Sequence, residues 1–102
     1  MQRDQDEVIL NSFVAQRLKQ YRERRNMTRE MLARRLYVEV TAIERAEAGE
    51  ARLDALYLYE ACQLLGVSLR TFFEGYDVFR EETIRKPAAH APAAESSLAG
   101  AS

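Results

Sequence analysis

The first pattern of apolar residues at helical spacing begins at Phe13. Phe13, Val14, Leu18 and Tyr21 recur with arginine and lysine between them, which predicts an amphipathic helix. The helix should end near Asn26, because asparagine tolerates the left-handed conformation that closes many helices. These residues open the domain that we expect over residues 13–75.

Residues 1–12 are expected to form an N-terminal extension. The segment starts with a polar run, MQRDQDE, and continues into the apolar residues Val8, Ile9 and Leu10. Asp4, with Glu7 three positions later, has the spacing of a helix cap. We therefore expect that a helix could start within this extension.

The stretch from Thr28 to Gly49 predicts two short helices around a tight corner, a helix-turn-helix. Thr28 is a favoured N-cap residue and Glu30 suits the first turn of a helix. The apolar residues that should share one face of this first helix are Met31, Leu32 and Leu36.

The second helix of the pair is predicted over residues 40–47. Ile43 and Ala46 should face inward, whereas the outward positions are Val40, Thr41, Glu44 and Arg45. Because so short a helix buries a single stripe, its outer face is free to meet a partner. A helix of this size fits the major groove of DNA, which is about 12 Å wide.

Two further helices are predicted after the corner. Apolar residues recur every third position over residues 53–65, on one side of a helix that Gly66 ends: Leu53, Leu56, Tyr59, Cys62 and Leu65. Ser68 should then cap a short helix over residues 69–74, which Gly75 terminates.

The C-terminal part has two segments of different character. Residues 76–86 could form one more helix, with Val78, Phe79 and Ile84 as its apolar stripe. Residues 87–102 are rich in alanine, proline and serine, and we expect them to be disordered, because they offer little apolar surface to bury. The predicted fold is therefore all-α, with five helices and a possible sixth.

Composition adds a contrast between two segments of the chain. The 102 residues suit a single domain, and the formal net charge of −1 gives no general argument for nucleic-acid binding. Residues 14–35, however, carry eight basic and two acidic side chains, a local net of +6. Residues 36–63 carry two basic and six acidic side chains, a local net of −4.

Several classes of protein are excluded by what the sequence lacks. The single cysteine, Cys62, excludes an intrachain disulfide and fits a small core residue, and there is no long apolar run. We therefore expect a cytoplasmic protein that does not span a membrane. One histidine and one cysteine provide no metal site, and no catalytic or phosphate-binding motif is present, so we expect neither an enzyme, a cofactor nor a small-molecule ligand.

Residues 13–75 resemble the XRE family of helix-turn-helix proteins, the family of lambda repressor and Cro. The resemblance is carried by three segments in order: VAQRLKQYRERRNMTREMLARRL, AIERAEAGEARLD and LLGVSLRTFF. Within them, the family pattern is matched by Thr28, Glu30, Leu32 and Ala33, and then by Ile43, Glu47 and Gly49.

The resemblance implies a five-helix fold whose recognition helix is 40–47, usually binding as a dimer to paired half-sites about one turn of DNA apart. Matched position by position, it implies that base edges are read by Val40, Thr41 and Arg45. It implies that the DNA backbone is contacted by Thr28, Arg29 and Arg52. It also implies a buried ion pair between Arg22 and Glu47.

Three residues depart from the family pattern. Tyr37 stands at the corner where the family favours glycine, and a left-handed conformation there would cost about 1–2 kcal/mol. Glu39 stands where a small hydroxyl residue usually caps the recognition helix, and Glu44 adds a second acid. The resemblance implies a sequence-specific transcriptional regulator of double-stranded DNA, and we expect a repressor that binds a palindromic operator as a homodimer. The acids leave an alternative hypothesis, a protein-interaction adaptor or antitoxin-type module with an acidic face.

Aromatic residues near the C-terminus raise the question of a homodimer. The rings in question are Tyr57, Tyr59, Phe72, Phe73, Tyr76 and Phe79. They could form a twofold interface over residues 69–84, where related proteins commonly dimerise. Alternatively, they close the core against the first helix.

Overall fold

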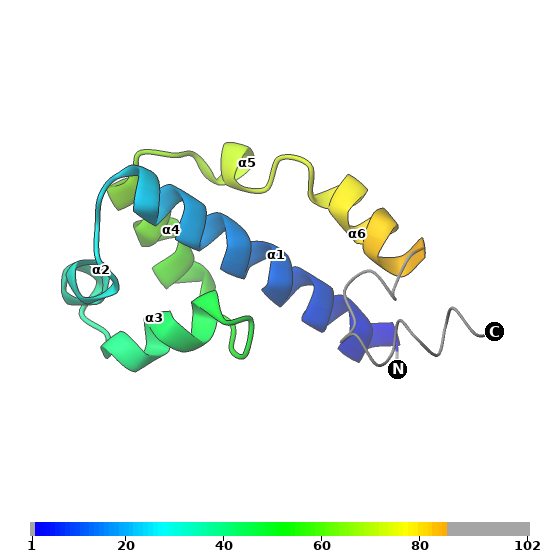
Figure 1. Cartoon of the computed structure of the whole chain (residues 1–102), viewed down its shortest axis with the longest axis horizontal. Coiled ribbons are helices and arrows are strands. Elements are labelled where there is room, and N and C mark those ends of the chain that lie inside the picture. Colours follow the sequence, from blue (N-terminus) through cyan, green and yellow to red (C-terminus); the bar gives the residue numbers. More distant parts are fainter. Residues whose placement is uncertain (1, 86–102) are drawn as a thin grey trace.

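The computed structural model describes residues 2–85, with side chains from residue 5 onward. This part of the chain is all-α, as predicted, and contains six helices: α1 (Gln2–Arg24), α2 (Arg29–Leu36), α3 (Val40–Glu47), α4 (Ala55–Leu65), α5 (Leu69–Phe72) and α6 (Tyr76–Arg85). Figure 1 shows α2, α3 and α4 gathered around the C-terminal half of α1, with α6 beside its N-terminal half. The disorder predicted for residues 87–102 concerns residues outside the described range.

Helix α1 begins eleven positions earlier than the apolar pattern predicted, at Gln2 instead of Phe13. Asp4 lies inside the helix, so its predicted role as a cap is wrong. The helix continues this far because Ile9 is buried one turn before Phe13, and because Asp6 pairs with Arg80 of α6 at 2.9 Å. Tertiary packing therefore makes residues 2–12 the first half of α1.

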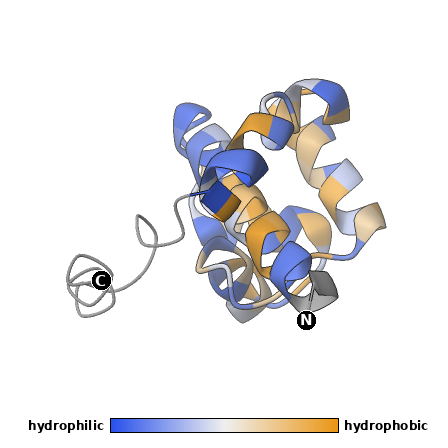
Figure 2. Cartoon of the chain, turned by 90° about the vertical axis from the view of Figure 1, so that its right-hand side faces the viewer, coloured by the Kyte–Doolittle hydropathy of each residue, from blue (hydrophilic) through white to orange (hydrophobic). Residues whose placement is uncertain are grey.

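The core lies between α1 and the short helices. Its largest fully buried side chains come from five of the six helices: Phe72, Leu18, Leu32, Leu36, Ile43 and Cys62. Cys62 is a core residue, as predicted, and burial raises the pKa of its thiol from 9.0 to about 11. In Figure 2 hydrophobic and hydrophilic residues both occur along the helices, as expected for helices with one buried face.

The buried face of α4 differs from the predicted one. The residues that face the core are Leu58, Ala61, Cys62 and Leu65, whereas Leu56 is 62 % exposed and Tyr59 is also exposed. Positions three apart drift by about 60° per step around a helix, because a turn has 3.6 residues. The alternating spacing of three and four residues stays on one side, and that spacing is the one that is buried.

The C-terminal aromatic rings turn toward α1. The Phe13 ring lies 6.0 Å from Phe73, 5.1 Å from Tyr76 and 5.3 Å from Phe79, measured between centroids. Phe72 is fully buried against Tyr21. Four of the six rings thus pack against α1, as in the alternative to a dimer interface, whereas Tyr59 is exposed.

The last two helices also differ in detail from the prediction. Helix α5 has four residues and ends at Phe72, although Ser68 caps it as predicted, its Oγ accepting from the Thr71 N–H. In α6 the predicted stripe is confirmed at Phe79, which packs against Phe13, and is wrong at Val78 and Ile84, which are exposed.

Candidate nucleic-acid interface

Helix α2 starts at a side-chain cap. Thr28 is extended, with φ −82° and ψ 163°, and its Oγ1 accepts a hydrogen bond from the Met31 N–H at 3.0 Å. Leu32 and Leu36 are buried as predicted, whereas Met31 is exposed and does not share their face. The cap fixes the position at which Arg29, the first residue of α2, leaves the corner after α1.

The turn between α2 and α3 is left-handed at Tyr37, with φ 61° and ψ 42°. The Tyr37 and Val38 N–H groups donate to the carbonyl oxygens of Arg34 and Ala33, which closes the end of α2. The Tyr37 side chain is 91 % exposed, so packing against the core does not compensate the strain of this conformation. The corner thus keeps its helix-turn-helix shape with tyrosine at the position where the family favours glycine.

Helix α3 presents one face to the core and one to solvent. Ile43 and Ala46 are buried, as predicted, and Val40 is half-buried against the core. The outer residues, all exposed, are Thr41, Glu44 and Arg45. Among the described residues, Glu39 at the start of α3 makes no side-chain capping hydrogen bond.

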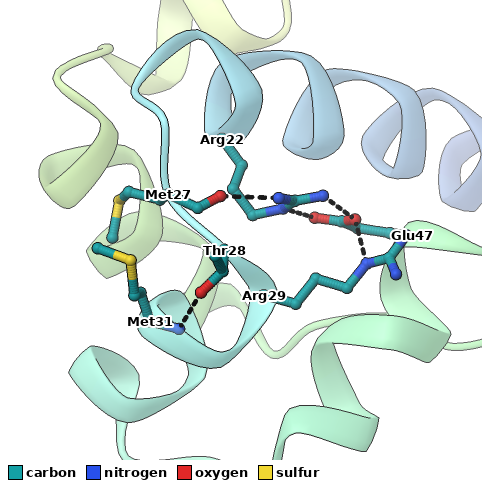
Figure 3. A network of polar contacts seen from close by, with 6 residues as sticks. All are labelled: Arg22, Met27, Thr28, Arg29, Met31 and Glu47. Atoms are coloured by element: carbon teal, nitrogen blue, oxygen red, sulfur yellow. Dashed lines mark hydrogen bonds and ion pairs between the residues drawn. The ribbon is translucent and has the colours of Figure 1, made fainter.

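A cluster of three charged side chains joins α1, α2 and α3 (Figure 3). Arg22 donates from Nε to Oε2 of Glu47 at 2.6 Å and from a terminal nitrogen to Oε1 at 2.9 Å. Arg29 donates from its Nε to the same Oε1 at 3.0 Å. Sequence reasoning paired Arg22 with Glu47 but did not anticipate that Arg29 also binds this carboxylate.

The burial of the three side chains is graded. The Glu47 side chain is 1 % exposed and that of Arg22 is 8 % exposed, whereas that of Arg29 is 41 % exposed. Arg22 also donates to the Met27 carbonyl oxygen at 2.8 Å, which ties the cluster to the corner between α1 and α2. Arg29 is therefore the member that reaches solvent.

The hydrogen bonds of the cluster keep its groups ionised. Burial by itself would raise the pKa of Glu47, but the hydrogen bonds from Arg22 and Arg29 outweigh it and hold the pKa below the usual value. The hydrogen bond to Glu47 raises the pKa of Arg22, against the opposing effect of burial. Two cations thus share one anion, and the cluster carries a net positive charge.

An open polar groove lies beside this cluster, between the end of α1, the start of α2 and the outer side of α3. Its charged lining residues are Lys19, Arg22, Glu23, Arg29, Glu30 and Glu44. Lys19 was not among the residues predicted for the interface. Its position three residues before Arg22, on the same side of α1, is a signal that could have identified it.

Arg52, predicted to contact the DNA backbone, lies in the loop before α4. A terminal nitrogen of its guanidinium is 3.7 Å from a carboxylate oxygen of Glu7, and both side chains are largely exposed. Glu7 belongs to the part of α1 that precedes Phe13, and no pattern along the chain pairs it with Arg52. The structure places Arg52 apart from the Arg22–Glu47–Arg29 cluster.

Residues 2–85 contain neither of two other kinds of site, a membrane span or a metal centre. No helix there is long and apolar enough to cross a membrane. In the same residues, no group of three or more histidine, cysteine, aspartate or glutamate side chains could hold a metal ion.

Comparisons with known proteins give one match. No curated protein and no solved structure matches the chain. The model of the helix-turn-helix family matches residues 18–72, more than half of the chain, from the C-terminal half of α1 to the end of α5. This range contains Arg22, Arg29 and Glu47 as well as the whole outer face of α3. The chain therefore belongs to the XRE family of helix-turn-helix proteins, whose shared domain binds DNA and is not an enzyme.

Proposed function

We propose that this protein is a transcriptional repressor that recognises a double-stranded DNA operator with α3 in the major groove. The observation that carries the proposal is the exposed outer face of α3, with Thr41 and Arg45 one turn apart, beside a cation at the start of α2. A short helix with a buried inner stripe and an exposed polar face is suited to enter a major groove.

Base reading is assigned to three residues of α3. The Arg45 guanidinium can donate two hydrogen bonds to O6 and N7 of guanine, and the Thr41 hydroxyl can bond to a base edge. Val40 is half-buried, which leaves part of its side chain for an apolar contact with a thymine methyl group.

Contacts to the DNA backbone are assigned to Thr28, Arg29 and Arg52. Thr28 and Arg29 stand together at the N-terminus of α2, where the helix dipole favours an anion. Arg52 is paired with Glu7, but an exposed ion pair at 3.7 Å contributes only about 0–1 kcal/mol. A phosphate could therefore replace Glu7 as the partner of Arg52.

We further propose that two copies bind a palindromic operator, with half-sites about one turn of DNA apart. The C-terminal segment 69–84 remains the proposed interface, although its aromatic rings face α1. The exposed apolar residues of this segment are Leu69, Val78 and Ile84. Sedimentation that gives a monomer at micromolar concentration, with and without operator, would exclude the homodimer.

The acids of the α3 region favour a second candidate function, a protein-interaction adaptor or antitoxin-type module. Glu39 and Glu44 are both exposed beside the face that should approach DNA, where they would repel phosphate. A basic protein partner would instead be attracted to them. The two candidates differ in salt response, because DNA binding through several phosphates weakens steeply with salt.

The decisive experiment is selection of duplexes from a random DNA pool by the wild type, Arg45→Ala and Arg35→Ala in parallel. Arg35 is the matched control, because it lines a different groove with Glu60 and Gln63 of α4. We expect the wild type and the control to recover the same palindrome, and Arg45→Ala to lose preference at one symmetric base pair. Absence of enrichment at low salt would contradict the proposal and favour a protein partner.

A further inference from the structure

The Arg29 guanidinium uses only one of its nitrogen atoms, Nε, in its hydrogen bond to Glu47. Its Nε donates to Glu47, whose side chain is almost completely buried and is itself fixed by two hydrogen bonds from Arg22. An arginine side chain has five N–H donors, and four of them are on the two terminal nitrogens. Within residues 5–85, the bond to Glu47 uses Nε and leaves the two terminal nitrogens of a partly exposed side chain for another partner.

Other carboxylates near Arg29 could compete with Glu47 for its guanidinium. Three carboxylates line the same groove: Glu23, Glu30 and Glu44. A cation that moved freely there could pair with any of these acids, and each pairing would occupy the guanidinium with a carboxylate in place of a phosphate. The bond from Nε to Glu47 selects one orientation of the guanidinium from these alternatives.

Lysine meets both demands less well at residue 29. Its three N–H donors are on one nitrogen, which would have to lie within hydrogen-bond distance of Glu47 and of the phosphate at the same time. The planar fork of arginine can bind a carboxylate through Nε and an oxygen of another anion through its terminal nitrogens. This geometry therefore favours arginine over lysine at residue 29, although both side chains carry a positive charge.

We propose that Glu47 is a positioning residue for DNA binding, because it orients Arg29 so that the terminal nitrogens of the guanidinium bind a backbone phosphate. This inference rests on the proposed DNA-reading function and adds to it. Glu47 does not touch DNA but acts through Arg29, and arginine is specifically required at residue 29.

The test compares the full-length wild type with Arg29→Lys, Arg29→Ala and the control Arg35→Lys. Binding to a labelled duplex of about 20 base pairs, enough for two half-sites, is measured by fluorescence anisotropy over a series of salt concentrations. Circular dichroism at the same temperature verifies that each variant is folded.

We expect Arg29→Lys to weaken binding about tenfold, close to the effect of Arg29→Ala, although lysine keeps the charge. The slope of log affinity against log salt should become shallower by about 1.8 in both variants, because each of the two copies on the duplex loses one phosphate contact, worth about 0.9. Arg35→Lys should bind as the wild type does. If Arg29→Lys keeps the affinity and the slope of the wild type, charge alone suffices and the inference is wrong.

A second comparison tests the role of Glu47 itself. We expect Glu47→Gln to weaken DNA binding when Arg29 is present, and to have much less effect in the Arg29→Ala background. Equal weakening in both backgrounds would show that Glu47 acts only through the fold, and would overturn the positioning role. If Glu47→Gln does not fold, the Arg29 series decides the inference by itself.

The two proposals fail in different ways. If the wild type binds no duplex at low salt, the proposed function is wrong, and the inference is wrong with it. If the wild type binds and Arg29→Lys binds equally well, only the inference is wrong.

Discussion

The two halves of α1 are held by different kinds of chemistry. In the C-terminal half, Arg22 shares a buried carboxylate with Arg29, and three hydrogen bonds fix the geometry. In the N-terminal half, Phe13 packs against three other rings, and the ion pair between Asp6 and Arg80 remains partly exposed.

This difference predicts which half of α1 should better tolerate amino-acid substitutions. A buried charge cluster depends on every member, because the loss of one leaves another charge unpaired in a poorly solvated site. An aromatic cluster depends mainly on the apolar area that it buries, which decreases gradually with the size of the side chain. The C-terminal half of α1, which holds Arg29 of α2 through Glu47, should therefore be the less tolerant one.

The largest expected effect is that of Glu47→Ala. The variant leaves the Arg22 guanidinium buried without its counter-ion, and we expect it to lower the free energy of unfolding by about 3–5 kcal/mol. Urea denaturation followed by circular dichroism measures the loss. The double variant Arg22→Met/Glu47→Leu should recover most of the stability, because it removes both buried charges together. A double variant as unstable as Glu47→Ala would contradict this account.

The free energy of unfolding should fall at acid pH, in part because Glu47 becomes protonated. Because the pKa of Glu47 in the folded protein lies below its ordinary value of 4.5, the unfolded chain takes up this proton at a higher pH than the folded chain does. The stability from this carboxylate is therefore complete above about pH 4.5 and is lost as the pH falls through the lower folded value. Unfolding free energies measured from pH 6 to pH 2 should decrease more steeply for the wild type than for Arg22→Met/Glu47→Leu. Parallel profiles would exclude Glu47 as a source of the acid sensitivity.

A milder change in the aromatic half is Phe13→Leu. Leucine keeps much of the apolar bulk but loses the ring contacts, so we expect a loss of about 1–2 kcal/mol. The loss should be local, because Phe13 touches Tyr76 and Phe79 of the last helix. Amide hydrogen exchange should speed up in α6 and change little in α2 and α3. Equally faster hydrogen exchange in all helices would show that the two halves of α1 are not stabilised independently.

The smallest expected effect is a gain at the corner between α2 and α3. Tyr37→Gly removes the side-chain penalty of the left-handed conformation and sacrifices little packing, because the tyrosine is almost fully exposed. We expect an increase in unfolding free energy of about 1 kcal/mol, measured by thermal or urea denaturation. A loss of stability would mean that the Tyr37 ring contributes more than its exposure indicates.

Local signals in the sequence predicted the elements around the corner. Thr28 caps α2 and Ser68 caps α5, and Asn26 is left-handed after the end of α1. The inward residues of α3, Ile43 and Ala46, also follow from spacing alone. These features depend on hydrogen bonds and side-chain positions within about one helical turn, so a short stretch of sequence contains the information that sets them.

The sequence alone thus specified the all-α class, the caps at Thr28 and Ser68, and the exposed positions Thr41, Glu44 and Arg45 of α3. Tertiary structure decided that α1 starts at Gln2, because residues far apart in the chain, Asp6 and Arg80, meet there. It also decided that Arg29 binds Glu47, although several carboxylates lie within its reach. The physical reason is that a long charged side chain pairs with the acid that the fold brings closest and buries most deeply, and neither distance nor burial can be read from spacing along the chain.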